Sequence, residues 1–225
     1  MTTLHVLRVF AGPGGRGGNP LGVFLEGSSI PPERRLPVAR DLGFSETVFV
    51  DEVDADGARI AIFTPGRELP FAGHPTIGTS WLLRQTGTTV DRLIVPAGVV
   101  ETWQADELAW IRGRASWVHP ITIVSYEDPA EVDRLKGSPN GEGSWYAWAW
   151  VDEAAGTLRS RYFAAGLGIR EDEATGAAAV VMGDQLGRAL TIRQGVGSEL
   201  HVRPGAGGAV EVGGRVLLDD VRDYE

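Results

Sequence analysis

The sequence predicts an α+β fold of two similar halves, each a sheet wrapped around one central helix. Many short apolar segments alternate with turns rich in the chain's 31 glycines, a pattern typical of strands joined by short connections. One segment, residues 75–83, is apolar on nearly every side, as a helix buried inside a domain is. The same layout of strand, turn, glycine and apolar helix returns about a hundred residues later, and such repetition indicates a duplicated architecture.

The first predicted strand, Leu4–Phe10, is followed by a glycine-rich loop, Gly12–Gly18. The loop contains the pattern GxGxxG, which in dinucleotide-binding proteins joins a strand to a helix. Here a second strand-like segment, Leu21–Leu25, follows instead. We therefore interpret the loop as a flexible hairpin connection and reject the dinucleotide site.

Pro31–Leu42 is predicted to be a helix that Gly43 terminates. The next segment, Phe44–Val50, alternates like a strand and places Glu46 on the face that carries Phe and Val. Two interpretations remain open. Glu46 lies in solvent at a strand end, or it is a carboxylate held in an apolar cleft, where burial would raise its pKa and suit it to acid–base chemistry near neutral pH.

The central helix follows a predicted strand at Ala58–Phe63 and the segment Phe71-Ala-Gly-His-Pro75. Pro75 suits the first turn of a helix, because its missing N–H would have no partner there. The backbone N–H groups near His74 are left without partners, and such a helix start attracts an anion. We expect a buried helix whose positive end opens to a cleft.

The remaining chain contains the second copy of this layout. A strand at Trp145–Val151 carries Tyr146, Trp148 and Trp150 on one face, which indicates core packing or a subunit contact rather than a base-binding platform. The two buried helices should direct their starts at one cleft.

The other expected elements are strands at Leu93–Val95, Val99–Trp103, Leu108–Ile111, Ile121–Ser125, Leu158–Phe163, Ala189–Gln194, Glu199–Arg203, Ala209–Val212 and Arg215–Leu218, helices at Asp128–Leu135 and Ala177–Leu186, and loops at Lys136–Ser144 and Ala164–Thr175.

Composition excludes several classes of function. The formal net charge of −9 and the pI of about 5.0 argue against nucleic acid or an anionic membrane surface as a partner. The chain has no cysteine and four scattered histidines, so neither a thiol nucleophile nor a metal site is expected. No segment approaches the roughly 20 apolar residues of a membrane span, and the N-terminus does not resemble a signal peptide. We expect a cytoplasmic protein.

Several motifs resemble the PhzF-like phenazine-biosynthesis isomerase family. They are GGNPLGVF (17–24), GFSETVFV (43–50), FTPGRELPFAGHPTIGT (63–79), VPAG (95–98) and RYFAAGLGIREDEATGAAA (161–179). The resemblance implies the diaminopimelate-epimerase-like fold, with two pseudo-symmetric halves of curved, mostly antiparallel sheet and an active site between them. It also implies a homodimer and neither a metal nor an organic cofactor. We expect the halves at residues 1–104 and 105–225, with a shortened second half whose last strand packs back on the first.

The resemblance also assigns site residues. Glu46 matches the family's catalytic acid/base, and His74 and Asp172 match residues of its pocket. Expected substrate-binding residues are Asn19, Gly73, Thr175, Gly176 and Ala177. Two departures stand out, because Glu173 replaces a usual proline and Ala177 replaces a usual serine, which removes one hydroxyl donor.

We therefore expect an isomerase in which Glu46 removes a proton from carbon and returns it elsewhere on the same small carboxylate-bearing molecule. By resemblance the model substrate is a dihydro-hydroxyanthranilate. The helix starts at Gly73-His74 and Gly176-Ala177 would hold its carboxylate. Two alternatives remain. One is a non-catalytic member that binds a metabolite or only dimerises. The other is an amino-acid epimerase, for which Asp172 is the visible second base, since the absence of cysteine excludes a two-thiol racemase.

Overall fold

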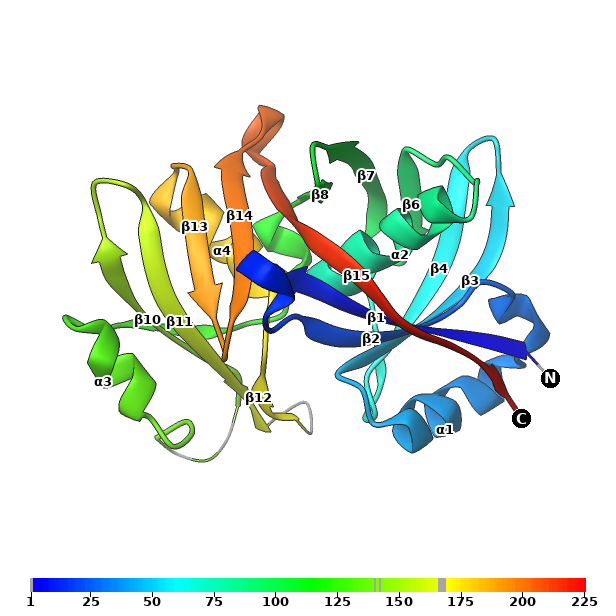
Figure 1. Cartoon of the computed structure of the whole chain (residues 1–225), viewed down its shortest axis with the longest axis horizontal. Helices are drawn as coiled ribbons and strands as arrows, with labels where there is room; N and C mark the ends of the chain where they lie inside the picture. Colours follow the sequence, from blue (N-terminus) through cyan, green and yellow to red (C-terminus); the bar gives the residue numbers. More distant parts are fainter. Residues whose placement is uncertain (1, 140, 142, 166–168) are drawn as a thin grey trace.

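The structure is a computed structural model that describes residues 2–139, 141, 143–165 and 169–225. In these residues the alternating apolar segments form one 15-stranded, mostly antiparallel sheet, which is accompanied by four α-helices (Figure 1). The elements fall into two repeats and a final strand. The first repeat contains β1 (Thr2–Ala11), β2 (Asn19–Phe24), α1 (Pro32–Leu42), β3 (Glu46–Asp54), β4 (Gly57–Phe63), β5 (Glu68–Leu69), α2 (Gly73–Gln85), β6 (Arg92–Val95) and β7 (Gly98–Ala105). The second contains β8 (Leu108–Gly113), β9 (Thr122–Ser125), α3 (Pro129–Arg134), β10 (Trp145–Asp152), β11 (Thr157–Ala164), β12 (Ile169–Asp172), α4 (Gly176–Leu186), β13 (Leu190–Gln194) and β14 (Ser198–Pro204), and β15 (Val210–Tyr224) follows.

The two repeats share one pairing pattern. In the first, β3 pairs antiparallel with β4, and β4 pairs parallel with β6 across helix α2. In the second, β10 pairs antiparallel with β11, and β11 pairs parallel with β13 across helix α4. The predicted boundary between residues 104 and 105 falls at the end of β7.

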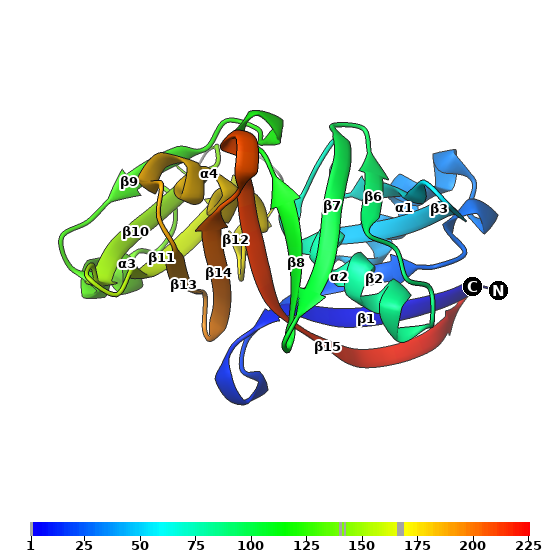
Figure 2. The ribbon, with the colours of Figure 1, turned by 90° about the horizontal axis from the view of Figure 1, so that it is seen from above.

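The last strand, β15, belongs to both repeats. It pairs with β14 and β8 along its first part and with β1 along its second part, which closes the first repeat into a ring of strands. Figures 1 and 2 show β15 running from the second repeat to the chain ends beside β1. The sheet therefore continues from one repeat into the other.

The apolar helices predicted from the sequence occupy the centres of these sheets. Ile77, Leu82 and Leu83 of α2 and Val180 and Met182 of α4 lie in one hydrophobic core that spans both repeats. Burial of such side chains is worth roughly 1.5–3 kcal/mol each. Smaller clusters fill the space beneath α1 and α3.

The mixed α+β class is confirmed, and two element predictions are wrong. The predicted loop at Ala164–Thr175 contains strand β12, which pairs with β11. The predicted strands Ala209–Val212 and Arg215–Leu218 are one strand, because Gly213 and Gly214 do not turn but let β15 pass against the rings of Trp110 and Phe10. Within the predicted loops, residues 140, 142 and 166–168 lie outside the described residues.

The predicted aromatic face of β10 packs as expected for a core. Tyr146 is fully buried. Trp148 and Trp150 are partly buried against the main core, and their rings contact each other edge to face. Among the helices that the structure describes, none is long and apolar enough to cross a membrane.

Candidate active site

The first turns of α2 and α4 meet backbone to backbone. A Cβ on Gly73 would lie 2.6 Å from the carbonyl carbon of Gly176, and a Cβ on Gly176 would lie 2.9 Å from the backbone nitrogen of His74. Glycine is therefore required at both positions. Neither helix is capped by the side chain of its N-cap residue, Ala72 or Thr175, so the N–H groups of both first turns remain available to a ligand. The two helix dipoles place positive potential at this junction.

Glu46 lies at this junction as the first residue of β3. Its carboxyl Oε2 is 3.2 Å from Nδ1 of His74, the second residue of α2. The contact does not have the geometry of a hydrogen bond, and Oε2 has no other partner among the described residues. Glu46 is 7% exposed and His74 is 3% exposed. Of the two interpretations of Glu46, the structure selects the buried carboxyl.

Burial determines the charge of this pair. Desolvation raises the pKa of Glu46 well above its ordinary value, and the neighbouring Asp172 carboxylate raises it further. Desolvation lowers the pKa of His74 to about 3, and the Pro20 carbonyl offsets this only in part. The imidazole is therefore neutral near pH 7, so the contact is not an ion pair. An unpartnered carboxyl with a raised pKa is a candidate general acid and base.

Asp172, at the end of β12, is held by neighbours from both repeats. It is 4% exposed, and burial raises its pKa, an effect that hydrogen bonds from Thr175, Asn19 and Ser45 oppose. The Asn19 amide donates to Asp172 Oδ1 at 2.7 Å, and the Thr175 hydroxyl donates to Oδ2 at 2.6 Å. Each carboxylate oxygen therefore accepts a hydrogen bond, which holds the Asp172 side chain in a fixed orientation.

A further layer holds Thr175. The amide of Gln194 on β13 accepts from the Thr175 backbone N–H at 3.2 Å and donates to the Thr175 hydroxyl at 2.8 Å. It also donates to the backbone carbonyl of Asp172 at 3.0 Å. No sequence pattern singles out Gln194, since a lone glutamine at a strand end is ordinary.

Tyr162 is a further neighbour of the carboxyl groups that was not predicted from its motif. This residue lies opposite Asp172 in the β11–β12 pair, and its hydroxyl is 3.0 Å from Nε2 of His119. Burial raises the pKa of Tyr162 to about 12, and the charges of Asp172 and Glu46 contribute to the rise. Tyr162 stands in the quoted motif, but only the pairing of β11 with β12 reveals that it neighbours the carboxyl groups.

The structure brings all eight predicted site residues to the junction of the two helix starts. Glu46, His74, Gly73 and Asn19 come from the first repeat. Asp172, Thr175, Gly176 and Ala177 come from the second. Ala177, the second residue of α4, presents only a methyl group. In the part of the chain that the structure describes, no three His, Asp or Glu side chains are grouped as metal ligands.

Glu173, the residue in place of a usual proline, has a structural role. Its carboxylate accepts hydrogen bonds from the backbone N–H of Val196 at 2.9 Å and from the hydroxyl of Ser198 at 2.8 Å. The Ser198 hydroxyl in turn accepts from the backbone N–H of Gly18. Glu173 thereby ties the segment before α4 to the β13–β14 turn and to the loop after β1.

Comparisons with known proteins agree with this architecture. Residues 8–108 match the family model described as phenazine biosynthesis-like protein. The trans-2,3-dihydro-3-hydroxyanthranilate isomerase of Pseudomonas fluorescens is 31% identical over 210 residues, which cover 76% of this chain and 75% of that protein. An uncharacterised isomerase of Pasteurella multocida, PM1503, is 45% identical over 83 residues, but that match covers only 36% of this chain and 28% of the relative.

A solved structure shows the same fold. The PhzF-family phenazine biosynthesis protein of Bacillus anthracis superposes with a TM-score of 0.81 at 20% identity, covering 100% of this chain and 99% of that one. The likeness therefore extends over both repeats and β15.

Proposed function

Because the chain belongs to the phenazine biosynthesis-like protein family, we propose that it is an isomerase that moves a proton between two carbon atoms of one small carboxylate-bearing molecule without a cofactor. Several relatives carry isomerase names. The observation that supports the proposal best is the buried Glu46 carboxyl, which has a raised pKa, contacts neutral His74 and lies between two uncapped helix starts.

The chemistry needs one group that accepts a proton and then releases it. In its carboxylate form Glu46 takes a proton from a substrate carbon, and the electron pair of the broken C–H bond shifts along the conjugated molecule. The protonated carboxyl, which can exchange its proton with solvent at this stage, then gives a proton back to form a new C–H bond elsewhere. The proton count does not change. A raised carboxyl pKa reduces the gap to a carbon acid and so favours the first transfer.

The surroundings of Glu46 suit an anionic substrate. The first-turn N–H groups of α2 and α4 can donate to the substrate carboxylate, and neutral His74 adds no charge beside it. Because Glu46, His74 and Asp172 are each less than a tenth exposed, substrate entry requires some of the residues that cover them to move. The epimerase alternative is less favoured, because both oxygens of Asp172 already accept hydrogen bonds.

Replacement of Glu46 tests the role of the carboxyl. The relative from Pseudomonas fluorescens suggests trans-2,3-dihydro-3-hydroxyanthranilate as the first substrate to assay. We expect Glu46→Gln to lower the rate of isomerisation, and of substrate deuterium uptake in D2O, by about 10²–10⁴-fold, because a positioned general acid–base contributes that much. Proton NMR measures both quantities.

Glu52→Gln is the matched control. Glu52 lies on the same strand but is exposed, with only a 4.0 Å contact to Arg59, so its replacement should leave both rates unchanged. Isomerisation at the wild-type rate by the Glu46→Gln variant would refute the proposal. The proposal also includes a homodimer, which sedimentation equilibrium measures directly.

A further inference from the structure

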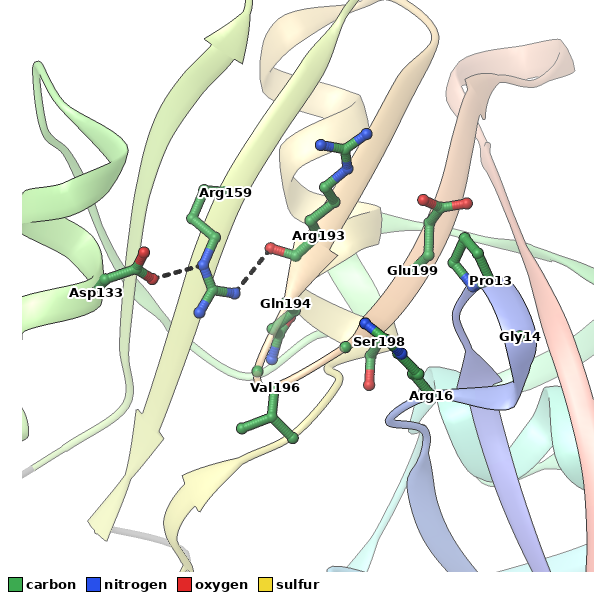
Figure 3. Close-up of a pocket in the computed structure, with 12 residues that line it drawn as sticks. Pro13, Gly14, Arg16, Asp133, Arg159, Arg193, Gln194, Val196, Ser198 and Glu199 are labelled. Atoms are coloured by element: carbon green, nitrogen blue, oxygen red, sulfur yellow. Dashed lines mark hydrogen bonds and ion pairs between the residues drawn. The ribbon is translucent and has the colours of Figure 1, made fainter.

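A cavity lies between the loop after β1 of the first repeat and strands β11 and β13 of the second, outside the cluster around Glu46. Its volume is about 760 Å³, and neither Glu46, His74 nor Asp172 lines it. Figure 3 shows its lining residues, among them Arg16 on the loop after β1, Arg159 on β11, and Arg193 and Gln194 on β13. The turn Gly195–Gly197 completes it. We call this cavity the arginine pocket.

The GxGxxG loop forms one wall of the arginine pocket through Pro13, Gly14 and Arg16. A Cβ on Gly12 would lie 2.1 Å from the Gly197 carbonyl oxygen, and a Cβ on Gly17 would lie 2.5 Å from the backbone nitrogen of Ser198. The loop therefore packs backbone to backbone on the β13–β14 turn. This close approach fixes the position of Arg16 relative to β13.

Two of the three guanidinium groups lack protein partners. Arg159 donates to Asp133 at 2.7 Å, but the side chains of Arg16 and Arg193 make no hydrogen bond or ion pair with another described residue. Two carboxylates line the same pocket. Asp133 is already paired with Arg159, and Glu199 lies opposite Arg193 in the β13–β14 pair and contacts His201 at 3.4 Å. Three arginines thus face two carboxylates, in a chain whose net charge is −9.

We propose that the arginine pocket binds a small anion carrying a phosphate or carboxylate group, held between Arg16 and Arg193. Planar guanidinium groups bind such oxyanions through two parallel charge-assisted hydrogen bonds. Because one arginine belongs to the first repeat and the other to the second, the bound anion would join the repeats at a place separate from the helix junction.

The arginine pocket is also connected to Asp172. Its lining residue Gln194 holds the Thr175 hydroxyl and the Asp172 carbonyl, and Ser198 on the same wall is bound by Glu173. An anion in the pocket would therefore stabilise the segment that carries Asp172. Binding itself does not depend on the proposed isomerase activity, so the two proposals can fail separately.

Phosphate and succinate are suitable probes of the two anion classes. Each is titrated into the full chain against sodium chloride at constant ionic strength, with calorimetry for binding and thermal unfolding for stability. We expect saturable binding and a rise in Tm, since a ligand of the native state stabilises it. The anion that binds more tightly identifies which of the two groups the pocket prefers.

Three variants locate the binding site. Arg16→Gln with Arg193→Gln should weaken binding by at least about tenfold, because each lost charge-assisted hydrogen bond costs more than 1.4 kcal/mol. Val196→Glu should weaken it as well, because Val196 is 90% exposed and the new carboxylate would repel the anion without disturbing packing. Arg92→Gln, at an exposed arginine on β6, should bind like the wild type.

Near-UV circular dichroism in chloride verifies that each variant is folded. The proposal is overturned if phosphate and succinate have the same effect as chloride at concentrations up to about 10 mM, because binding would then be weaker than roughly 3 kcal/mol. It is also overturned if the double arginine variant binds as tightly as the wild type.

Discussion

At the scale of single residues, the most consequential group is the Glu46 carboxyl. It is buried against neutral His74 with no hydrogen-bond partner on Oε2 among the described residues, an arrangement that costs stability when the group is ionised. A buried group of this kind persists where function requires it, and its removal often stabilises the protein. Glu46 therefore links activity to the pH dependence of folding.

We expect Glu46→Gln to be more stable than the wild type above about pH 5, with a difference that grows with pH. The folded-state pKa of Glu46 is raised, so the native state keeps this proton longer than the unfolded state. Its stabilising contribution is complete below the unfolded pKa of about 4.5 and is lost as the pH rises through the folded pKa. The slope for one proton is at most about 1.4 kcal/mol per pH unit.

Urea unfolding of the wild type and the variant from pH 4 to 9 measures this difference. Asp172 and His74 are present in both proteins, so their effects largely cancel. His74 acts in the opposite direction, because its pKa is lowered to about 3 and its contribution is lost as the pH falls from about 6.5 towards that value. Parallel stability curves for wild type and Glu46→Gln would contradict the expectation, and Glu52→Gln should give parallel curves.

The sequence pattern identified Glu46 as unusual but could not choose between solvent and a cleft. The choice depends on α2, which covers the start of β3, and on Asp172, a residue 126 positions later that approaches only through the β11–β12 pair. Family motifs supplied the roles of His74 and Asp172, whereas the apolar pattern and the internal repeat predicted the two helix starts. Gln194 and Tyr162 remained hidden, because their importance comes from partners on neighbouring strands.

At the scale of elements, the contact between the first turns of α2 and α4 determines the geometry of the site. The backbones meet at Gly73 and Gly176 with no room for a side chain. Any increase in the distance between the helices would move Glu46 and His74 away from the segment of Asp172. The junction is therefore sensitive to a single added methyl group.

We expect Gly73→Ala to lower the free energy of unfolding by about 1–3 kcal/mol, the usual cost of overpacking a filled interior. Gly176→Ala should behave alike, and both should lower activity more than Glu52→Gln does. Gly137→Ala is the control, because a Cβ on Gly137 meets nothing within 4 Å and should change stability little. Urea unfolding is the measurement, and wild-type stability of Gly73→Ala would show that the helices can separate without cost.

Most elements could be predicted from periodicity and turn residues, because buried helices and short strands leave clear local patterns. The failures have a common cause. Strand β12 is defined by its pairing with β11 and lacks a long apolar run of its own. The length of β15 was missed because Gly213-Gly214 resembles a turn, whereas the rings of Trp110 and Phe10 require glycine in an extended strand.

At the scale of the whole molecule, β15 makes the two repeats one cooperative unit. It contributes a strand to each sheet, and the main hydrophobic core extends through both. Neither repeat completes its hydrogen bonding without this strand. The chain should therefore unfold in one transition although its architecture is duplicated.

We expect calorimetric and van 't Hoff enthalpies of unfolding to agree, and α2 and α4 to lose hydrogen-exchange protection together. Val212→Pro should reduce protection in both helices, because Val212 pairs with Val202 on one side and Ile111 on the other and proline removes the N–H of the ladder. Val124→Pro on edge strand β9 should affect the second repeat alone. Two separate calorimetric transitions in the wild type would contradict this picture.

The pairing of β1 with β15 also has a consequence for synthesis in the cell. Arg8 and Asp219 form an ion pair across this strand pair although they are 211 positions apart. At roughly 5–20 residues per second, a ribosome needs on the order of ten to forty seconds to make the intervening chain. During that interval one edge of β1 stays unpaired on the nascent chain, so the first repeat cannot close its ring of strands until β15 emerges.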